Sequence, residues 1–230
     1  MKIIDGDVDL KELLLTELPD LSDVSVRGDF YCNENYLQSL KGAPTHAGGH
    51  FDCSDNNLRS LKGTPTHVGR DFRCDNNYLQ SLEGAPTHVG NNFYCTNNNL
   101  QSLEGAPTHV GGHFWCIGCN LQSLKGGPVY VKRDYFCDYN NLKDLENAPR
   151  KINGYFYCTN NKLKSLKGAP LRVGGHFACS DNELQSLEGC PKYVGGSFVC
   201  VSNRGIEITE EMIRKVCEVA GRIVLHEDDY

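Results

Sequence analysis

The chain of 230 residues lacks an excess of positive charge and lacks any long apolar run. Lys and Arg number 23 against 29 Asp and Glu, which gives a formal net charge of −6. Binding to a phosphate backbone depends on Lys and Arg, so this balance disfavours nucleic acid as a partner. No apolar stretch reaches the length of a membrane span, so we expect no membrane partner either.

The N-terminal residues lack the features of a secretory signal. The stretch from Met1 to Asp9 carries three aspartates and no apolar segment of the kind that a signal peptide requires. We therefore expect a cytoplasmic protein, and secretion by a route that needs no signal stays open.

Cysteine, in contrast, is abundant, and its spacing is regular. In a short secreted chain, 12 cysteines would indicate a disulfide framework. Nine of them, however, follow one another at intervals of 21 residues, at positions 32, 53, 74, 95, 116, 137, 158, 179 and 200. Prolines keep the same interval from position 44 to position 191. This regularity indicates a structural repeat and predicts reduced thiols.

The repeats share the consensus P-x-x-V-G-G-x-F-x-C-x-x-N-x-L-x-S-L-x-G-A. The pattern resembles the leucine-rich repeat L-x-x-L-x-L-x-x-N-x-L, because Phe51, Cys53, Asn56 and Leu58 fall on its conserved positions. It departs from that pattern in using Phe-x-Cys for Leu-x-Leu and glycine at the first leucine. The resemblance covers about residues 24–203 and is strongest to the short, Cys- and Gly-rich repeats of bacterial and bacteriophage proteins.

This resemblance implies a repeat solenoid: a right-handed superhelix with a parallel β-sheet of nine strands on its concave face. The alternation of side chains along a strand places Phe and Cys inward. We expect an extended or polyproline-like convex side without helices, because proline disfavours helix. The buried asparagines hydrogen-bond the backbone at the turn, and Cys119 interrupts their column and weakens the solenoid locally.

Both ends are expected to cap the solenoid. Residues 1–23 form an N-terminal cap with a short helix at about 10–18, because Asp9 and Glu12 resemble a capping box and a leucine stripe follows. Residues 204–230 form a C-terminal cap, with a helix at about 210–220 that begins after Thr209 and ends at Gly221, then an acidic tail.

Catalytic, metal and cofactor chemistry are not expected. Cys116 and Cys119 have the spacing of a zinc ligand pair, but no second pair accompanies them. The histidines that follow Pro-Thr form one column, which we interpret as solvated. No set of nucleophile, base and orienting group recurs, so we expect a protein that is not an enzyme and holds no metal or cofactor.

The residue between Phe and Cys faces solvent on the concave side. Along the chain this column contains Tyr31, Asp52, Arg73, Tyr94, Trp115, Phe136, Tyr157, Ala178 and Val199. Four consecutive aromatic residues at an outward position predict an interaction site. The alternative is that these rings only stack on one another and stabilise neighbouring strands.

The flanking columns are acidic. With the central column they carry nine carboxylates against one base, Arg73, which lies between Asp71 and Asp75. An aromatic stripe with an acidic rim favours a protein partner that has apolar anchors and a basic surface. The residues predicted to bind it are Tyr94, Trp115, Phe136, Tyr157, Tyr139, Tyr155, Asp134, Asp138, His113, Arg73 and Asp52.

The hypothesis is therefore a non-catalytic protein-binding module. The resemblance suggests a phage or bacterial protein that acts on a host factor, such as a defence protein, in the host cytoplasm if the chain is phage-encoded. Two alternatives stay open: a protein that binds or sequesters a small molecule such as a nucleotide or sugar, and a structural solenoid that self-associates. The oligomeric state stays open as well.

Overall fold

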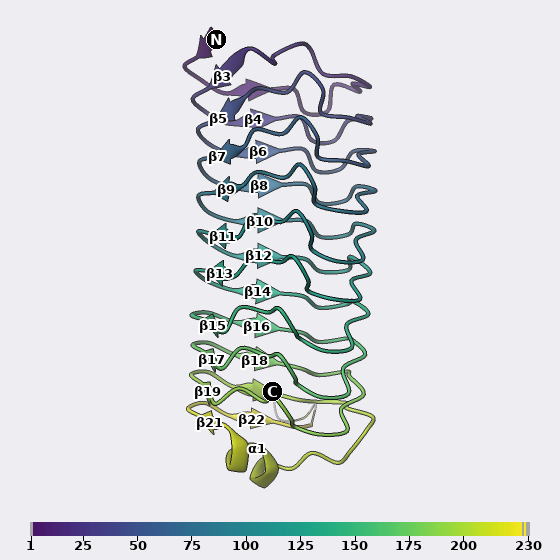
Figure 1. Ribbon diagram of the computed structural model, residues 1–230, viewed down its shortest axis with the longest axis vertical. Coiled ribbons are helices and arrows are strands. Elements are labelled where there is room, and N and C mark those ends of the chain that lie inside the picture. Colours follow the sequence, from purple (N-terminus) through teal and green to yellow (C-terminus); the bar gives the residue numbers. More distant parts are fainter. Residues whose placement is uncertain (1, 227, 229–230) are drawn as a thin grey trace.

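The computed structural model describes residues 2–226 and 228, which form a solenoid of stacked coils (Figure 1). Each 21-residue repeat makes one coil and contributes two short strands to two different faces. In the described residues the larger face, called the concave sheet, is a parallel sheet of 11 strands: β2 (Val8–Asp9), β4 (Phe30–Tyr31), β6 (Phe51–Asp52), β8 (Phe72–Arg73), β10 (Phe93–Tyr94), β12 (Phe114–Trp115), β14 (Tyr135–Phe136), β16 (Phe156–Tyr157), β18 (Phe177–Ala178), β20 (Phe198–Val199) and β22 (Ile223–Val224).

The second face consists of two further parallel sheets, called the lateral sheets. In the described part of the chain the first has seven strands: β1 (Lys2–Ile4), β3 (Val24–Val26), β5 (His46–Ala47), β7 (His67–Val68), β9 (His88–Val89), β11 (His109–Val110) and β13 (Tyr130–Val131). The other has four: β15 (Lys151–Ile152), β17 (Arg172–Val173), β19 (Tyr193–Val194) and β21 (Glu218–Val219). The lateral sheets were not predicted from the sequence.

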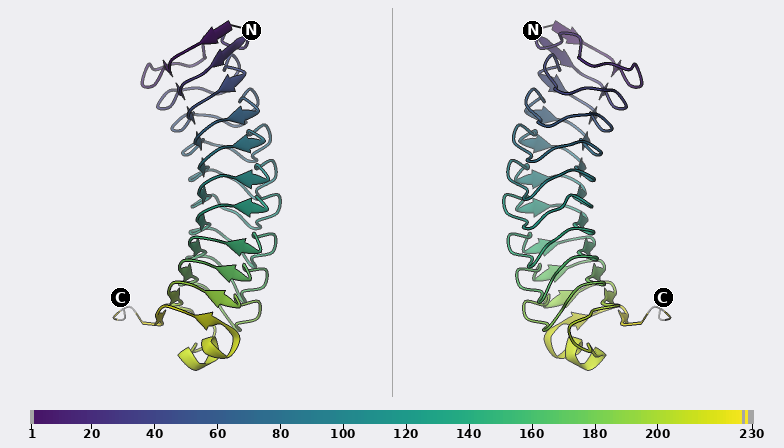
Figure 2. Two further views of the ribbon diagram at one scale, coloured as in Figure 1. Left: turned by 90° about the vertical axis from the view of Figure 1, so that its left-hand side faces the viewer. Right: turned by 90° about the vertical axis from the view of Figure 1, so that its right-hand side faces the viewer.

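The stack of coils is bent along its length, and Figure 2 shows the strands of the concave sheet along the inner side of the bend. The predicted parallel sheet on the concave face is therefore confirmed. The concave register pairs equivalent residues of neighbouring coils, for example Phe93 with Phe114 and Tyr94 with Trp115. Because no insertion shifts this register, every repeat position becomes a straight column of side chains.

The core is a column of aromatic rings flanked by leucine and cysteine. The phenylalanines that begin the concave strands are fully buried, and successive rings pack together, as Phe30 and Phe51 do with centroids 5.1 Å apart. Tyr135 takes the place of phenylalanine in one coil and is also buried. Truncating one such ring to alanine in a close-packed core costs about 3–5 kcal/mol, so each ring of this column contributes substantially to stability.

Side chains also bind each coil to its neighbour. Asn77 donates from Nδ2 to the carbonyl oxygens of Cys53 and Cys74 at 3.1 and 3.3 Å, and its Oδ1 accepts from the N–H of Leu58 at 2.9 Å. The other repeat asparagines make the same type of contact. The cysteine thiols point inward and donate to the next coil, as Cys74 Sγ does to the carbonyl of Tyr94 at 3.3 Å.

The N-terminal helix predicted at about 10–18 is wrong. This segment belongs to a first coil, in which β1 and β2 pair with β3 and β4. Glu12 and Leu14 adopt φ values of 56° and 58°, which an α-helix does not allow. The N–H groups of Leu13 and Leu15 both donate to Oδ1 of Asn35 instead. The leucine stripe therefore packs as one more coil, because neighbouring backbone supplies its hydrogen bonds.

The C-terminal helix α1 spans Glu210–Val216 and is shorter than the predicted 210–220. Thr209 caps it by accepting a hydrogen bond from the N–H of Met212 at 3.3 Å. Cys217 is extended, and the next residues form β21 and β22, which pair with β19 and β20. The chain thus ends in a further coil, because the last repeat offers it strand partners. Most of the predicted acidic tail, at Glu227, Asp229 and Tyr230, lies outside the described residues.

Candidate functional site

The aromatic stripe on the concave sheet is a continuous ladder of rings. Trp115 lies between Tyr94 and Phe136, with ring centroids 5.8 and 4.3 Å away. Tyr157 meets Phe136 edge to face at 5.2 Å. Tyr155 stacks beside Tyr157 at 5.8 Å, which widens the ladder. The rings therefore stabilise one another, as the alternative interpretation of the sequence required.

Exposure along the central column is lower than the sequence predicted. Phe136 is only 9% exposed, because Trp115 and Tyr157 cover its ring from the two neighbouring coils. Asp52, 8% exposed, accepts from the N–H and hydroxyl of Ser54 at 3.0 and 2.6 Å. The prediction that Phe136 and Asp52 are accessible to a partner is wrong, whereas Tyr94, Trp115 and Tyr157 stay partly exposed.

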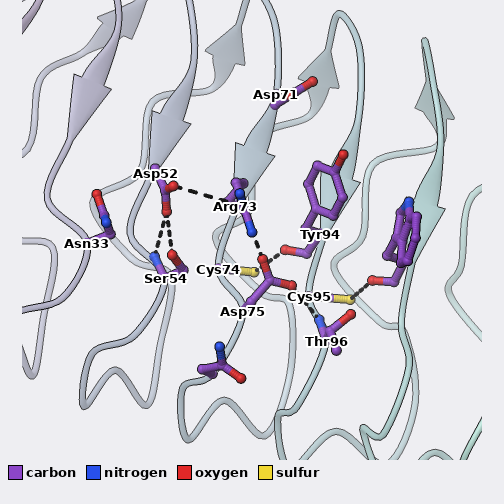
Figure 3. Close-up of polar contacts among 12 residues, drawn as sticks. Asn33, Asp52, Ser54, Asp71, Arg73, Cys74, Asp75, Tyr94, Cys95 and Thr96 are labelled. Atoms are coloured by element: carbon purple, nitrogen blue, oxygen red, sulfur yellow. Dashed lines mark hydrogen bonds and ion pairs between the residues drawn. The ribbon is translucent and has the colours of Figure 1, made fainter.

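The charged end of the stripe is internally paired, as Figure 3 shows. Arg73 Nε lies 3.3 Å from Asp75 and 3.9 Å from Asp52, and its guanidinium lies 5.0 Å from the centre of the Tyr94 ring. Asp75 also accepts from the N–H of Thr96 at 2.9 Å. Burial raises the pKa of Asp75 to about 6, and Arg73 opposes that rise. Arg73 is therefore occupied by this chain's own carboxylates.

The side chains that precede the buried Phe of each coil border the aromatic stripe, and they also form hydrogen bonds between coils. Asp29 Oδ1 accepts from the N–H of His50 at 2.7 Å, and Asp134 Oδ1 accepts from the N–H of Tyr155 at 2.7 Å. Asp134 Oδ2 also lies 2.8 Å from Nδ1 of His113. These side chains replace strand hydrogen bonds at the edge of the sheet. Asp134 and His113, predicted to bind a partner, are thus committed in part to joining coils.

Asp138 differs from the other carboxylates of the concave face. It is 7% exposed, and its Oδ1 accepts from the N–H of Thr159 at 2.9 Å. Burial raises the pKa of Asp138 to about 6. No Lys, Arg or His within the described residues lies within ion-pair distance of it. Asp138 is therefore a buried carboxylate without a cation, unlike Asp75.

A hollow of about 700 Å³ adjoins Asp138 on the concave face. Tyr139 and Tyr157 stand at its sides, and the small residue Ala178 leaves the space that aromatic rings fill in the three preceding coils. It is lined by Ile117, Asp138, Tyr139, Tyr157, Thr159, Ala178, Ser180, Asp181, Val199, Val201 and Ser202. The apolar floor was not predicted from the sequence, although Ala178 and Val199 follow the aromatic residues in the central column.

Tyr139 is the most accessible of the predicted residues, with 64% of its surface exposed. Its backbone is left-handed, with φ of 55°, as at the equivalent turn position of the other coils. This conformation disfavours a bulky side chain by about 1 kcal/mol. The turn carries the ring outward from the coil, next to the hollow. Tyr155, 40% exposed, is also accessible.

The cysteine and histidine columns show no constellation for metal or redox chemistry. Burial raises the pKa of the repeat thiols well above the ordinary value, for example at Cys74 and Cys116, which keeps them protonated. Cys119 is buried and donates to the carbonyl of Cys95 at 3.0 Å, so it partly replaces the missing asparagine. Within the described residues, no three His, Cys, Asp or Glu side chains are placed to hold a metal ion.

Stacked parallel coils, an inward asparagine ladder and a concave parallel sheet make the described chain a β-solenoid with the architecture expected from the leucine-rich-repeat pattern. No protein-family model and no curated protein matches the sequence. Among solved structures, the chain is similar to YopM from Yersinia enterocolitica WA-314, with a TM-score of 0.47 and 19% sequence identity. The match covers 96% of this chain and 55% of YopM, so the chain spans about half the length of that protein.

No helix in the part of the chain that the structure describes is long and apolar enough to cross a membrane.

Proposed function

We propose that the chain is a non-catalytic binding module that takes an apolar anchor of a protein partner into the hollow beside Tyr157. The observation that carries this proposal is an apolar floor, at Ala178 and Val199, beside the exposed Tyr139 and the partly exposed Tyr157. Hot spots of protein interfaces are aromatic residues around a desolvated pocket. The stacked rings of the stripe supply a rigid wall that needs little ordering when a partner docks.

The proposed partner also carries a positive group next to its apolar anchor. Asp138 is buried without a cation, and Asp181 lines the same hollow. A Lys or Arg side chain from the partner would stabilise the ionised form of Asp138. Binding would then exchange the unfavourable burial of a lone carboxylate for a buried pair, which favours a basic partner over an acidic one.

The resemblance of the repeat to phage and bacterial repeats supports a finer proposal, in which the partner is a host factor such as a defence protein. That step rests on likeness of the repeat and on no particular residue. The residues of the hollow define the chemistry of the partner, an apolar anchor beside a cation, and leave its identity to experiment.

The test is affinity capture from bacterial lysate with three baits that have the same circular dichroism spectrum. The baits are the wild type, Trp115→Ala/Tyr157→Ala, and the control Tyr36→Ala/Tyr78→Ala, which removes two exposed aromatic rings outside the hollow. We expect one protein to be retained by the wild type and the control and lost with the stripe variant. Equal capture by all three baits would contradict the proposal.

The size of the hollow favours a second candidate, a small aromatic or sugar ligand. Its volume of about 700 Å³ lies within the range of small-ligand sites, which is about 300–1,000 Å³. Native mass spectrometry of the purified protein distinguishes the two. A co-purified mass that disappears in Ala178→Phe would support the ligand, and a bare protein mass would remove this candidate.

A further inference from the structure

The lateral sheets differ in charge from the concave sheet over most of their length. In eight successive coils two exposed or partly exposed side chains precede a buried Val, Ile or Ala, whereas Glu218 precedes Val219 in the next coil. None of the 16 residues at these positions in eight successive coils is acidic, although the chain contains 29 Asp and Glu. They are Thr45, His46, Thr66, His67, Thr87, His88, Thr108, His109, Val129, Tyr130, Arg150, Lys151, Leu171, Arg172, Lys192 and Tyr193.

Positive charge gathers in the C-terminal half of this surface. Six exposed cations lie there, and in the described residues none of them forms an ion pair with a carboxylate: Lys132, Arg133, Arg150, Lys151, Arg172 and Lys192. Aromatic rings accompany them, since Arg172 lies 4.2 Å from the centre of the Tyr193 ring and Tyr130 is 43% exposed. Unpaired cations in a row attract a polyanion.

The coils separate at the centre of this surface, between β13 and β15. These two strands are not hydrogen-bonded, and Figure 1 shows a wider space between them than between the neighbouring lateral strands. In the preceding pair the N–H of Val129 donates to Thr108 and that of Lys132 to Val110. In the described structure the N–H groups of Arg150 and Asn153 make no equivalent bond.

The separation coincides with asparagine in place of glycine at one repeat position. A Cβ at Gly111 would lie 2.1 Å from the carbonyl oxygen of Gly90, and a Cβ at Gly174 would lie 2.1 Å from that of Asn153. A side chain at this position therefore points at the backbone of the preceding coil. Asn153 occupies it in the coil that contains β15, and its Nδ2 donates to the carbonyl of Lys132 at 3.2 Å. Lys132 also replaces this glycine, but its coil stays paired with β11, so we attribute the separation to Asn153.

The separation forms a hollow of about 780 Å³ with both cationic and flat apolar walls. Arg150 and Lys151 stand at its edge beside the ring of Tyr130 and the apolar surface of Val129 and Pro149. Backbone N–H groups of the coil that contains β15 add donors for an anion. A phosphate beside a planar ring matches this combination of cations, N–H donors and an aromatic face.

We propose that the lateral surface binds single-stranded nucleic acid, with phosphates on the row of cations and a base against Tyr130 in the hollow between β13 and β15. Grooves for single strands combine positive charge with aromatic side chains on which bases stack. Every nucleotide carries a planar base beside its phosphate, whereas an acidic polypeptide places a ring beside a carboxylate only where its sequence has an aromatic residue. The net charge of −6, which disfavours nucleic acid as a partner, averages two faces of opposite sign.

The test measures fluorescence anisotropy of a labelled oligouridine of about 12 nucleotides in about 50 mM salt, with a salt titration. The variant Arg150→Glu/Lys151→Glu is compared with Lys41→Glu/Lys62→Glu, which reverses two exposed lysines of another turn. We expect the first to weaken binding at least about tenfold and to lower the salt slope by about 1.4, because a single strand releases about 0.7 counterion per phosphate contact. The control should bind as the wild type does.

Two further variants separate the hollow from general attraction. Asn153→Gly restores the glycine position without changing charge, and Tyr130→Ala removes the stacking face; each should weaken binding about tenfold, because one stacked base is lost. Wild-type affinity in both variants would overturn the base-binding hollow. So would equal affinity for a duplex.

Three other results would overturn the proposal as a whole. The first is no binding by the folded wild type. The second is displacement of the oligonucleotide by polyglutamate as effectively as by unlabelled oligouridine, which would indicate an acidic protein partner. The third is a low-salt dimer, seen by light scattering without oligonucleotide and absent in Arg150→Glu/Lys151→Glu, which would indicate a second copy of the chain.

Discussion

Two stretches of the concave sheet, three coils apart, contain the same buried carboxylate in different surroundings. Asp75 and Asp138 occupy one repeat position, and each accepts a hydrogen bond from a threonine N–H of the next coil at 2.9 Å. Beside Asp75, Arg73 supplies a cation and lies over Tyr94. Beside Asp138 there is no such cation, and a hollow opens. The same scaffold position is thus a closed structural contact in one place and an open site in the other.

The difference arises from two positions of the central column. Arg73 closes one stretch with its long side chain, whereas Ala178 is too short to reach its neighbours and leaves the other open. The site therefore arises where one coil has a small side chain in the central column. The remaining coils have a larger side chain or an ion pair at this position. Substitutions that exchange these features test the comparison directly.

The largest expected effect comes from filling the hollow. Ala178→Phe would extend the ring ladder from Tyr157 by one coil, so we expect partner affinity to fall at least about 30-fold while the free energy of unfolding stays within about 0.5 kcal/mol. Isothermal titration calorimetry with the captured partner measures the loss. Val199→Ala, which enlarges the hollow, should retain binding, and equal affinity of wild type and Ala178→Phe would place the site elsewhere.

The next effect concerns Asp138 and depends on pH. Its folded pKa of about 6 is above the ordinary 3.8, so the folded state binds the proton more tightly and ionisation destabilises the fold. That penalty is absent below about pH 4, grows between about pH 4 and 6, and is complete above pH 6. Asp138→Asn should therefore raise the free energy of unfolding by about 2–3 kcal/mol at high pH, and by little in acid.

Urea unfolding at about pH 7.5 and pH 4 measures this difference, and Asp75→Asn is the matched comparison. Asp75 has the same raised pKa, but its replacement also removes the partner of Arg73, so a smaller gain is expected. A gain for Asp138→Asn that is equal at both pH values would show that burial of the charge is not its source.

Removing the cation from the closed stretch should have a moderate effect. Arg73→Ala leaves Asp75 buried without a cation, but the side chain of Arg73 is 49% exposed and solvent already screens the pair. We expect a loss of about 1 kcal/mol above pH 6, measured by urea unfolding, and a smaller loss in acid, where Asp75 is protonated. An unchanged midpoint at all pH values would remove the contrast with Asp138.

The smallest effect lies in the asparagine ladder between the two stretches. Cys119 donates to Cys95 but offers no amide oxygen to Leu100, whereas Asn98 accepts from Leu79 at 3.0 Å. Cys119→Asn should restore that bond and raise the free energy of unfolding by about 0.5 kcal/mol. A lower midpoint in urea would mean that the neighbouring Gly118 turn has adapted to the thiol.

The sequence was sufficient to predict the stacked coils, the inward Phe and Cys, and the outward aromatic column. These follow from an uninterrupted period and from the alternation of a strand. The burial of Phe136 was not predictable, because it depends on how the rings of Trp115 and Tyr157 lean over it. The lateral strands were also missed, since two residues such as His67 and Val68 carry no pattern of their own.

The failure at the N-terminus has a different reason. Leu10, Leu13, Leu14 and Leu18 have helical spacing, yet the Oδ1 of Asn35 accepts hydrogen bonds from the N–H groups of Leu13 and Leu15, and the chain bends to make them. Tertiary partners thus override local preference. The position of the hollow could be predicted from the sequence, because Ala178 interrupts the aromatic column. Its depth could not, because it depends on the left-handed turn that carries Tyr139 outward.

The side-chain ladders have a consequence for how the chain is made. The Nδ2 of Asn56 donates to the carbonyl of Cys32 in the coil before it, and the thiol of Cys53 donates to the carbonyl of Arg73 in the coil after it. A coil that has just left the ribosome is therefore incomplete until its successor emerges and closes its polar groups. Folding would therefore proceed from the N-terminus, with each new coil pairing with the one before it. A stalled ribosome would leave the last emerged coil with unpaired polar groups that other chains can bind.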